Sequence, residues 1–405
     1  MRIAEINMIP YGSTGKIMLQ IAETARKAGH EVRTYSTVPF DKKPKQAEIE
    51  AIDHYTFGSF TENKKHYYLG SLFGSNGLYS KKGTRELIRA LMEFKPDIVH
   101  LHNLHKFCIN LPLLFGYLKK SGVRVVWTLH DCWSFTGKCP HFVMAGCTKW
   151  QTECHHCPQL AGYPKSRLDA SRRMYRKKKK LFCDMERMTL VTPSAWLANL
   201  VSQSFLNDCD TRVIHNGINL SVFQPTENNF RKKHGLEDKK ILLGVSFGWG
   251  KGKGLDVFMG LARRLDDDYR IVLVGTNEKL DACFPENIIS IHRTSDQREL
   301  AEIYSAADLF LNPTREEVLG LVNIESLACG TPVLTFRTGG CPEILDEACG
   351  AVVACDDIDS MEKEIIRICE TKPYTAEACR ARAMQFDMQE KFSDYARLYE
   401  EVITQ

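Results

Sequence analysis

The sequence predicts an α/β protein with two doubly wound domains, each a parallel sheet between layers of helices. With 405 residues, the chain is too long for one hydrophobic core. Residues 3–35 have the pattern of a strand, a glycine-rich turn, a helix and a second strand. A new strand followed by another glycine-rich turn begins at Ile241. These two units open two separate sheets.

The composition indicates a globular protein of a reducing compartment. Hydrophobic residues make up 43% and charged residues 26% of the chain, and no run of 18 apolar residues predicts a membrane span. The first apolar run is short and interrupted by Glu5, which argues against a signal peptide. Fifteen cysteines without such a peptide favour free or metal-bound thiols in the cytoplasm. The net charge of +4 selects no partner by itself.

The first domain is expected to begin with four elements and a long connection. They are a strand at 3–9, a turn at 11–16, a helix at 17–28 and a strand at 31–35. The turn contains GSTGK, but the spacing before Gly15 and Lys16 is not that of a P-loop. Residues 39–82 are weakly periodic, which predicts a connection with little regular structure. A helix is expected at 82–93.

Two buried strands of the first domain end in polar residues. The strand at 96–102 ends at His102, and the strand at 123–129 is followed by His130 and Asp131. Doubly wound folds bind ligands at the carboxyl ends of their strands. His130 is therefore a candidate site residue, with a histidine paired to local backbone as the alternative. A strand at 189–194 is expected to be the last of this domain.

A cysteine cluster follows His130. Cys154 and Cys157 have the C-x2-C spacing that lets two thiolates reach one tetrahedral ion, and Cys139 and Cys147 would complete a four-thiolate site. The segment is too polar to fold on apolar burial alone, which favours a structural zinc. An iron–sulfur cluster and a loop of unligated thiols are the alternatives.

A basic helix is expected over 168–188. It carries Arg172, Arg173, Arg176 and the four lysines 177–180. Two interpretations explain this pattern equally well. One is a solvated helix face, and the other is attraction to anionic lipid headgroups or a lipid diphosphate. Nucleic acid is disfavoured, because basic residues interleaved with aromatic ones are absent elsewhere in the chain.

The second domain repeats the strand and turn pattern. After the strand at 241–247, a glycine-rich turn carries Lys251 and Lys253, a combination suited to a diphosphate. Further strands are expected at 270–275 and 288–293, followed by a helix at 299–307. Residues 359–405 are expected to be helical.

The stretch from Asn312 to Val333 gives the most specific pattern. Pro313 ends a buried strand, and a helix is predicted at 321–328, closed by Gly330. Glu317 lies in the loop before this helix and Glu325 about one turn inside it. The unpaired amides at the helix start would bind a diphosphate. These amides belong to Gly320, Leu321 and Val322.

This stretch resembles the E-x7-E signature of retaining glycosyltransferases of family 4, which have the GT-B fold of two Rossmann-like domains around a central cleft. The similarity continues through ACGTPV at 328–333 and is found again in the KG at 253–254 and the GGCPEI at 339–344. Val318 stands where the family usually has glycine. The family's arginine upstream of Lys253 is missing, and Lys251 is the expected replacement.

The resemblance implies a role for each candidate residue. Glu317 and His130 would hold the sugar, Glu325 the ribose and Lys253 the leaving diphosphate. Gly15 would let backbone approach a ligand, with a tight turn without ligand as the alternative. The candidate catalytic residues are His130, Glu317 and Lys253, and the candidate donor-binding residues are Gly15, Lys251, Gly320, Leu321, Val322, Glu325 and Arg293. The expected domains are 1–210, which binds the acceptor, and 211–388, which binds the donor, with a helix at 389–405 packing back on the first.

The implied function is transfer of a hexose from a nucleotide diphosphate sugar to a hydroxyl with retention. The expected acceptor is a glycan or lipid-linked glycan of capsule, exopolysaccharide or lipopolysaccharide synthesis, reached at the inner face of the membrane. No cofactor is expected for catalysis, since no Asp-x-Asp motif is placed to hold a metal, and no nucleic acid is expected as partner. A GT-B sugar epimerase and a non-enzymatic zinc and nucleic-acid binder are the alternatives.

Overall fold

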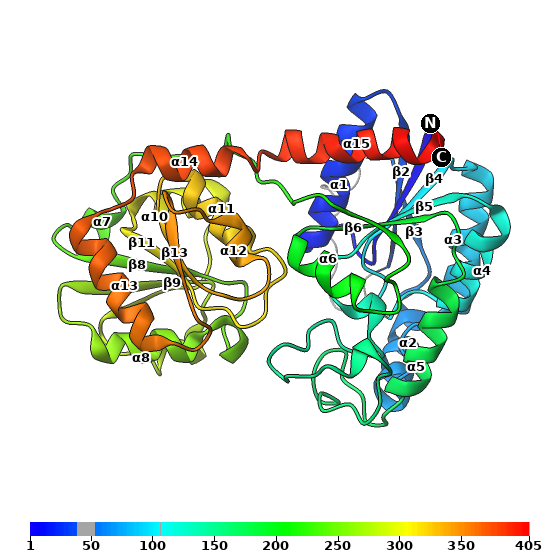
Figure 1. Ribbon diagram of the computed structural model, residues 1–405, viewed down its shortest axis with the longest axis horizontal. Helices are drawn as coiled ribbons and strands as arrows, with labels where there is room; N and C mark the ends of the chain where they lie inside the picture. The colour runs from blue at the N-terminus through cyan, green and yellow to red at the C-terminus, as the bar shows by residue number, and fades with distance from the viewer. Residues whose placement is uncertain (39–52, 106, 405) are drawn as a thin grey trace. The chain divides into compact units, whose positions relative to one another are not determined.

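The computed structural model describes residues 1–38, 53–105 and 107–404, which divide into two compact units. The first unit contains 1–215 together with 391–405, and the second contains 216–390. Within each unit, helices cover both faces of one parallel sheet (Figure 1). The predicted class, two Rossmann-like α/β domains, is confirmed.

The sheet of the first unit has the order β3-β2-β1-β4-β5-β6-β7 among the described residues, and every neighbouring pair is parallel. Chain order reverses between β1 and β4, the switch point where doubly wound folds bind ligands. The strands are β1 Arg2–Ile6, β2 Glu31–Thr37, β3 His54–Phe57, β4 Ile98–Leu101, β5 Arg124–Thr128, β6 Met188–Thr192 and β7 Asp210–Val213.

Helices on both faces bury these strands. β4 and β6 are buried along their whole length, as expected for parallel strands covered on two sides. The helices are α1 Gly12–Lys27, α2 Phe60–Phe73, α3 Lys81–Phe94, α4 Leu111–Ser121, α5 Ser171–Phe182, α6 Ala195–Ser202 and α15 Met388–Thr404.

The expectation of an irregular connection over 39–82 is wrong within the described residues, since β3 and α2 lie in this segment. Residues 39–52 are outside the described part of the chain. The inward face of α2 has Asn63, His66 and Gly70 in place of large apolar residues. Asn63 donates to Thr37 Oγ1 (2.6 Å), and His66 Nε2 accepts from the Gly77 amide (3.0 Å). A helix buried by polar contacts leaves no hydrophobic period in the sequence.

Two boundaries of the first unit also differ from the prediction. β6 is not the last strand, because β7 pairs with it at the sheet edge and exposes most of its residues, so it lacks a buried pattern. The helix expected from Ile17 begins at Gly12. Gly15 therefore lies inside the first turn of α1.

The sheet of the second unit has the order β10-β9-β8-β11-β12-β13. Alternate residues point to opposite faces. Leu242 and Leu309 pack with the helices α8 (Leu255–Arg264) and α13 (Ile358–Thr371). Ile241 and Phe310 pack with the helices α10 (Gln297–Ala306) and α11 (Leu321–Ala328) on the other face. The strands are β8 Lys240–Val245, β9 Tyr269–Val274, β10 Ile288–Ile291, β11 Leu309–Asn312, β12 Val333–Phe336 and β13 Gly350–Val353.

The predicted helix at 321–328 has the same bounds in the structure, as α11. The other helices of this unit are α7 Phe230–His234, α8 Leu255–Arg264, α9 Glu278–Asp281, α10 Gln297–Ala306, α12 Cys341–Ile344, α13 Ile358–Thr371 and α14 Ala376–Met384. Across the described residues, no helix combines the length and apolar character needed to span a membrane.

Candidate active site

All but one of the predicted donor residues of the second unit gather at its switch point. β8 and β11 are neighbours in the sheet but not in sequence, and the loops after both strands start at the same edge. The loop after β8 carries Lys251 and Lys253, and the loop after β11 carries Glu317 and Gly320. This is the edge where an open α/β sheet binds its ligand.

Lys253 and Glu317 form a direct ion pair between the two loops. Lys253 Nζ lies 2.7 Å from Glu317 Oε2, and Glu317 Oε1 accepts from the amide of Val318 (3.1 Å). The side chains are 41% and 24% exposed, so both ends are reachable from solvent. The pair places a cation and a carboxylate within reach of one small ligand.

The backbone of Glu317 is fixed by the turn at Gly339. Gly339 has φ +57°, and a Cβ there would stand 1.6 Å from the carbonyl oxygen of Glu317. Only glycine allows this approach. The GGCPEI turn therefore holds the loop that presents Glu317.

Glu325 points its carboxylate toward Tyr304. The Tyr304 hydroxyl donates to Glu325 Oε2 at 3.0 Å. Burial raises the pKa of Tyr304 well above its ordinary value, so the hydroxyl stays neutral and donates. Gly320, with φ +87°, begins α11, whose first amides have no partner within the helix.

Arg315 is a residue of this site that the sequence reasoning missed. Its guanidinium makes two bonds of 2.8 Å to Asp256, and Nε donates to Asp356 (2.6 Å). Its amide also donates to the carbonyl of Gly252 (2.9 Å), between the two lysines. The side chain is 9% exposed. An arginine beside Glu316 and Glu317 in the sequence gave no sign that its partners lie 59 and 41 residues away.

Arg293 lies away from this group. It is exposed after β10, which is separated from β8 by β9. The structure thus brings together Lys251, Lys253, Glu317 and the start of α11, but not Arg293.

In the first unit, His130 follows β5 at the carboxyl edge of the sheet. Its Nε2 lies 3.0 Å from Nδ1 of His102, which directly follows the neighbouring strand β4. His102 Nε2 lies 2.8 Å from Glu5 Oε2 on β1. Burial, and then His102, hold the pKa of His130 well below its ordinary value.

A second carboxylate and histidine pair lies at the same edge. His105 Nε2 is 2.8 Å from Asp131 Oδ2, and His105 Nδ1 is 3.1 Å from the hydroxyl of Tyr163. Burial would raise the pKa of Asp131, but His105, together with His141 and the amide of Trp133, outweighs burial and lowers it to about 2. His105 was not among the residues predicted from sequence.

Gly15 is held against its own chain. It is buried, and a Cβ would stand 2.6 Å from the carbonyl carbon of Pro10 and 2.8 Å from the oxygen of Ile9. Glycine is therefore required here by the close approach of backbone atoms in the loop between β1 and α1.

Comparisons with known proteins identify the family. The family model described as "Glycosyltransferase Family 4" matches residues 14–222, about half of the chain. The chain belongs to this family. A second model, "Glycosyl transferases group 1", matches residues 226–396 of the glycosyltransferase.

Individual relatives agree with this assignment. A putative colanic acid biosynthesis glycosyl transferase, WcaC of Escherichia coli, is 25% identical over 75% of this chain and 76% of its own. Sucrose-phosphate synthase from Thermosynechococcus elongatus aligns with a TM-score of 0.71 at 17% identity, covering 100% and 99% of the two chains. HepE of Anabaena, solved with UDP, gives 0.70 at 14% identity, covering 99% and 100%. The glycosyltransferase therefore has the GT-B type of fold.

The cysteine loop of the glycosyltransferase gathers the four predicted thiols around a cavity of about 20 Å³. Cys139 and Cys154 are buried, and burial raises the pKa of their thiols to about 12 and about 11. No three of the four sulfurs lie within 4.8 Å of one another. Sulfurs around one zinc ion would be closer, about 3.8 Å apart for a tetrahedron with Zn–S bonds of about 2.3 Å.

The loop nevertheless buries several aromatic side chains of its own. Trp133, Phe135, Phe142 and Trp150 are at most 5% exposed, and the rings of the last three contact one another in a small core. Lys178 of α5 is buried beneath it and donates to the carbonyls of Trp133 (2.5 Å) and Thr136 (3.0 Å). Lys138, a residue of the loop itself, donates hydrogen bonds to two further carbonyls of the loop.

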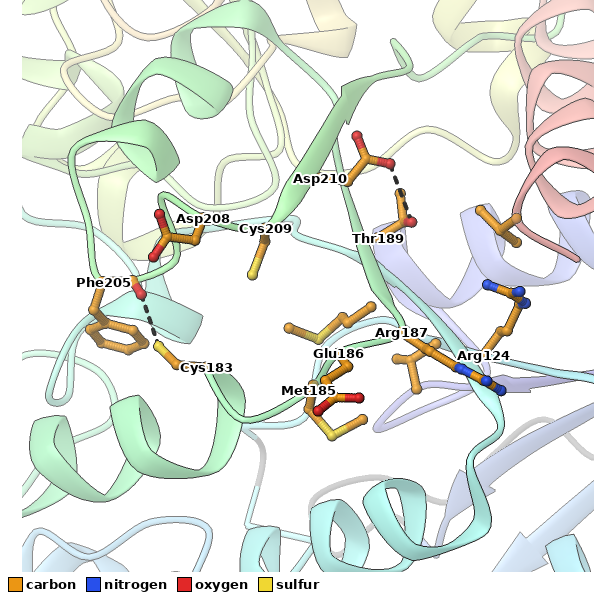
Figure 2. Close-up of a pocket in the computed structure, with 13 residues that line it drawn as sticks. Arg124, Cys183, Met185, Glu186, Arg187, Thr189, Phe205, Asp208, Cys209 and Asp210 are labelled. Carbon is orange, nitrogen blue, oxygen red and sulfur yellow. Dashed lines mark hydrogen bonds between the residues drawn. The ribbon is translucent and has the colours of Figure 1, made fainter. Parts of the chain in front are cut away.

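A separate pocket of about 410 Å³ lies at the opposite edge of the first sheet (Figure 2). It is lined at the amino ends of β5, β6 and β7, by Arg124, Thr189 and Asp210 among others. Residues of both charges line it. It contains none of the residues predicted from the sequence.

Proposed function

We propose that the glycosyltransferase moves a hexosyl group from a nucleotide diphosphate sugar to a hydroxyl acceptor and retains the anomeric configuration. The observation that carries this proposal is the ion pair of Lys253 and Glu317 beside the start of α11. Lys253, with Lys251 on the same turn, would neutralise the departing diphosphate. Glu317 would accept hydrogen bonds from sugar hydroxyls.

Further roles follow for the other groups. The amides of Gly320, Leu321 and Val322 would bind the diphosphate, and Glu325 the ribose. His130 would contact the sugar or the acceptor from the first unit. In the reaction, the bond from the anomeric carbon to the diphosphate would break as the bond to the acceptor oxygen forms on the same face, and the proton of the acceptor hydroxyl would pass to the departing diphosphate.

The proposed acceptor is a glycan or lipid-linked glycan of an extracellular polysaccharide or lipopolysaccharide. The description of WcaC as a colanic acid transferase supports this choice. We further propose that the enzyme works on the inner face of the membrane. Exposed basic residues of α5 support a contact with anionic lipid, namely Arg172, Arg173, Arg176, Lys179 and Lys180.

Apolar residues lie close to these cations. The amides of Arg167 and Leu168 donate to carbonyls at the end of α2, so this segment lies against that helix. Leu168 is 54% exposed and Tyr68 of α2 is 59% exposed. Basic residues beside exposed apolar and aromatic residues suit a membrane surface.

We also propose a structural zinc ion held by Cys139, Cys147, Cys154 and Cys157. The donor set fits, since four thiols line one cavity, and binding would draw the sulfurs closer together. Zinc would hold the loop that follows His130, and takes no part in the chemistry.

The test of the function is a thermal-shift panel of UDP-, GDP-, ADP- and CMP-linked sugars, followed by transfer assays. A true donor should raise the unfolding temperature, because it binds only the folded state. Glu325→Ala should weaken that binding roughly 10- to 100-fold through loss of a charged hydrogen bond. Tyr304→Phe, which removes one internal hydrogen bond of Glu325, is the matched control.

The product of the best donor and a fluorescent glycan acceptor is then examined by NMR. A linkage with the anomeric configuration of the donor supports the proposal. An inverted linkage would refute retention, and an epimerised nucleotide sugar without transfer would establish the epimerase alternative. Binding of oligonucleotides with no response to any nucleotide sugar would refute the enzyme assignment to this site.

A further inference from the structure

A chain of hydrogen bonds connects a buried carboxylate to the candidate site histidine. Glu5 Oε2 lies 2.8 Å from His102 Nε2, and His102 Nδ1 lies 3.0 Å from His130 Nε2. Glu5 is fully buried and His102 is 1% exposed, whereas His130 is partly exposed. The chain thus runs from the interior of the sheet to its ligand-binding edge.

The two imidazole rings meet in a good geometry for this bond. Their planes differ by 15°, and their centroids are 5.3 Å apart. With a bond of 3.0 Å between the two nitrogens, the centroids can be this far apart only when the bond lies nearly in line with both rings. The rings therefore meet edge to edge. The shared proton therefore lies close to the line between the two nitrogens.

The chemistry of the chain assigns its protons. An ionised carboxylate only accepts, so His102 Nε2 must carry a proton toward Glu5. A neutral His102 then has a bare Nδ1, which can only accept. His130 Nε2 must supply the proton of the second bond, which leaves Nδ1 of a neutral His130 without one.

The charge states required by this assignment agree with the surroundings. Burial would raise the pKa of Glu5, but His100 and His102 outweigh burial and lower it to about 2. Burial, and then His100, lower the pKa of His102 to about 4. At neutral pH the carboxylate is therefore charged and His102 is neutral.

Glu5 is itself fixed from its other side. Its Oε1 accepts from the hydroxyl of Tyr399 (2.7 Å), and His100 Nδ1 is 3.1 Å from its Oε2. His100 Nε2 is bonded to Thr128 (2.8 Å). The carboxylate cannot rotate away from His102 without losing these contacts.

We propose that Glu5 and His102 are positioning residues that hold His130 in the tautomer protonated on Nε2, so that Nδ1 accepts a hydrogen bond from a sugar hydroxyl. The ligand part of this inference rests on the proposed function. Among the described residues, Nδ1 of His130 has no hydrogen-bond partner. A nitrogen that only accepts suits a hydroxyl and cannot donate to a phosphate oxygen.

The tautomers can be observed directly by ¹⁵N NMR of the labelled, unliganded protein at pH 7.5. His130→Gln and His102→Gln spectra identify the two resonance pairs. We expect both rings to be neutral and protonated on Nε2. A proton on Nδ1 of either ring, or an imidazolium at His130, overturns the assignment, and this measurement needs no substrate.

Glu5→Gln tests the origin of the tautomer. A glutamine amide can donate to His102 Nε2, which lets the whole chain reverse. We expect His130 to populate the Nδ1-protonated form in this variant, while His54, bonded to Thr34 and Ser36 in the same unit, stays unchanged. A His130 tautomer that is unchanged in Glu5→Gln overturns the role of Glu5. If this variant does not fold, the wild-type spectrum still decides the assignment.

The ligand arm compares the nucleotide sugar selected by the thermal-shift panel with the matching nucleoside diphosphate. The Nδ1 resonance of His130 should shift with the sugar nucleotide and stay in place with the diphosphate alone. Equal shifts with both ligands, or no shift although each ligand is bound, would overturn the proposed contact between Nδ1 of His130 and a sugar hydroxyl. Failure of every nucleotide sugar to bind refutes the proposed function and leaves the tautomer result intact.

Discussion

At the scale of single residues, the ion pair of Lys253 and Glu317 is expected to contribute more to the rate of transfer than to the stability of the fold. The lysine side chain is 41% exposed, and ion pairs in such positions contribute only about 0–1 kcal/mol to folding. A cation aimed at a departing diphosphate contributes far more to the rate, because the charge develops in the transition state. Stability and turnover should therefore respond differently to its removal.

Lys253→Ala should lower kcat/KM for transfer by roughly 100-fold or more while the free energy of unfolding changes by at most about 1 kcal/mol. Steady-state kinetics and urea unfolding measure the two effects. Lys239→Ala is the matched control, since Lys239 pairs with Asp267 (3.0 Å) in the same unit but away from the loops. Equal losses of activity in both variants would show that Lys253 is not part of the site.

Arg315→Lys should loosen the turn that carries Lys251 and Lys253. Lysine cannot reproduce the two parallel bonds to Asp256 together with the bond to Asp356. We expect trypsin to cleave after Lys251 or Lys253 roughly tenfold faster, because a loss of about 1.4 kcal/mol raises the open population by that factor. Arg270→Lys, which alters a pair with Asp267, should leave this cleavage unchanged.

At the scale of elements, α11 and α2 show what the sequence can and cannot predict. α11 was predicted with its observed bounds, since glycine and proline flank an apolar helical run. α2 was missed because its buried positions are Asn63, His66 and Gly70, whose partners come from other elements. Sequence patterns record apolar burial, not a polar contact across the fold.

The same limit applies to the site. Glu317, Lys253 and His130 could be singled out from the sequence because each follows a strand, where parallel sheets bind ligands, and their roles stay predictions. Arg315, His105 and Glu5 could not be singled out, because their contacts are with partners far away in sequence, such as His102, which is 97 residues from Glu5. Glu5 stands in the middle of β1, a position that in sequence only interrupts an apolar run.

The cysteine loop gives a prediction about metal. Protein purified under reducing conditions should contain about one equivalent of zinc, which acid or a strong chelator should release because binding requires thiolates. Cys154→Ser with Cys157→Ser should abolish the zinc and lower transfer while nucleotide affinity is kept. Elemental analysis, thiol titration and nucleotide titration measure these effects.

The control for the cysteine experiment is Cys283→Ser with Cys355→Ser. Both residues are exposed thiols of the second unit, so this variant should keep its zinc and its activity. Protein without zinc or iron, in which all four loop thiols titrate freely, would refute the metal site. The small core of Phe135, Phe142 and Trp150 would then hold the loop by itself.

At the scale of the whole molecule, the charge of α5 bears on where the enzyme works. Lys178 is buried, and Arg172 and Arg176 both pair with Glu153, so the seven basic residues of this helix are not equivalent. Arg173, Lys179 and Lys180 are the exposed cations best suited to a lipid surface. The expectation that Lys178 belongs to the surface group is wrong.

Replacing Arg173, Lys179 and Lys180 by glutamine should weaken sedimentation with anionic vesicles roughly 100-fold, at about 1 kcal/mol for each charge. Vesicles of phosphatidylglycerol and phosphatidylcholine at 0.1 M salt provide the assay. Replacing Lys232, Lys233 and Lys363, exposed lysines of the second unit, removes the same charge elsewhere and should have little effect. Equal effects of the two triple variants would refute a contact through α5.

The bond between Tyr399 and Glu5 has a consequence for how the protein is made. The two residues are 394 positions apart, so Glu5 leaves the ribosome long before Tyr399 is synthesised. Until then the nascent amino-terminal sheet contains a buried carboxylate that lacks one of its donors, at a cost of about 1–3 kcal/mol. The unit that is translated first therefore completes its interior last, once Tyr399 has left the ribosome.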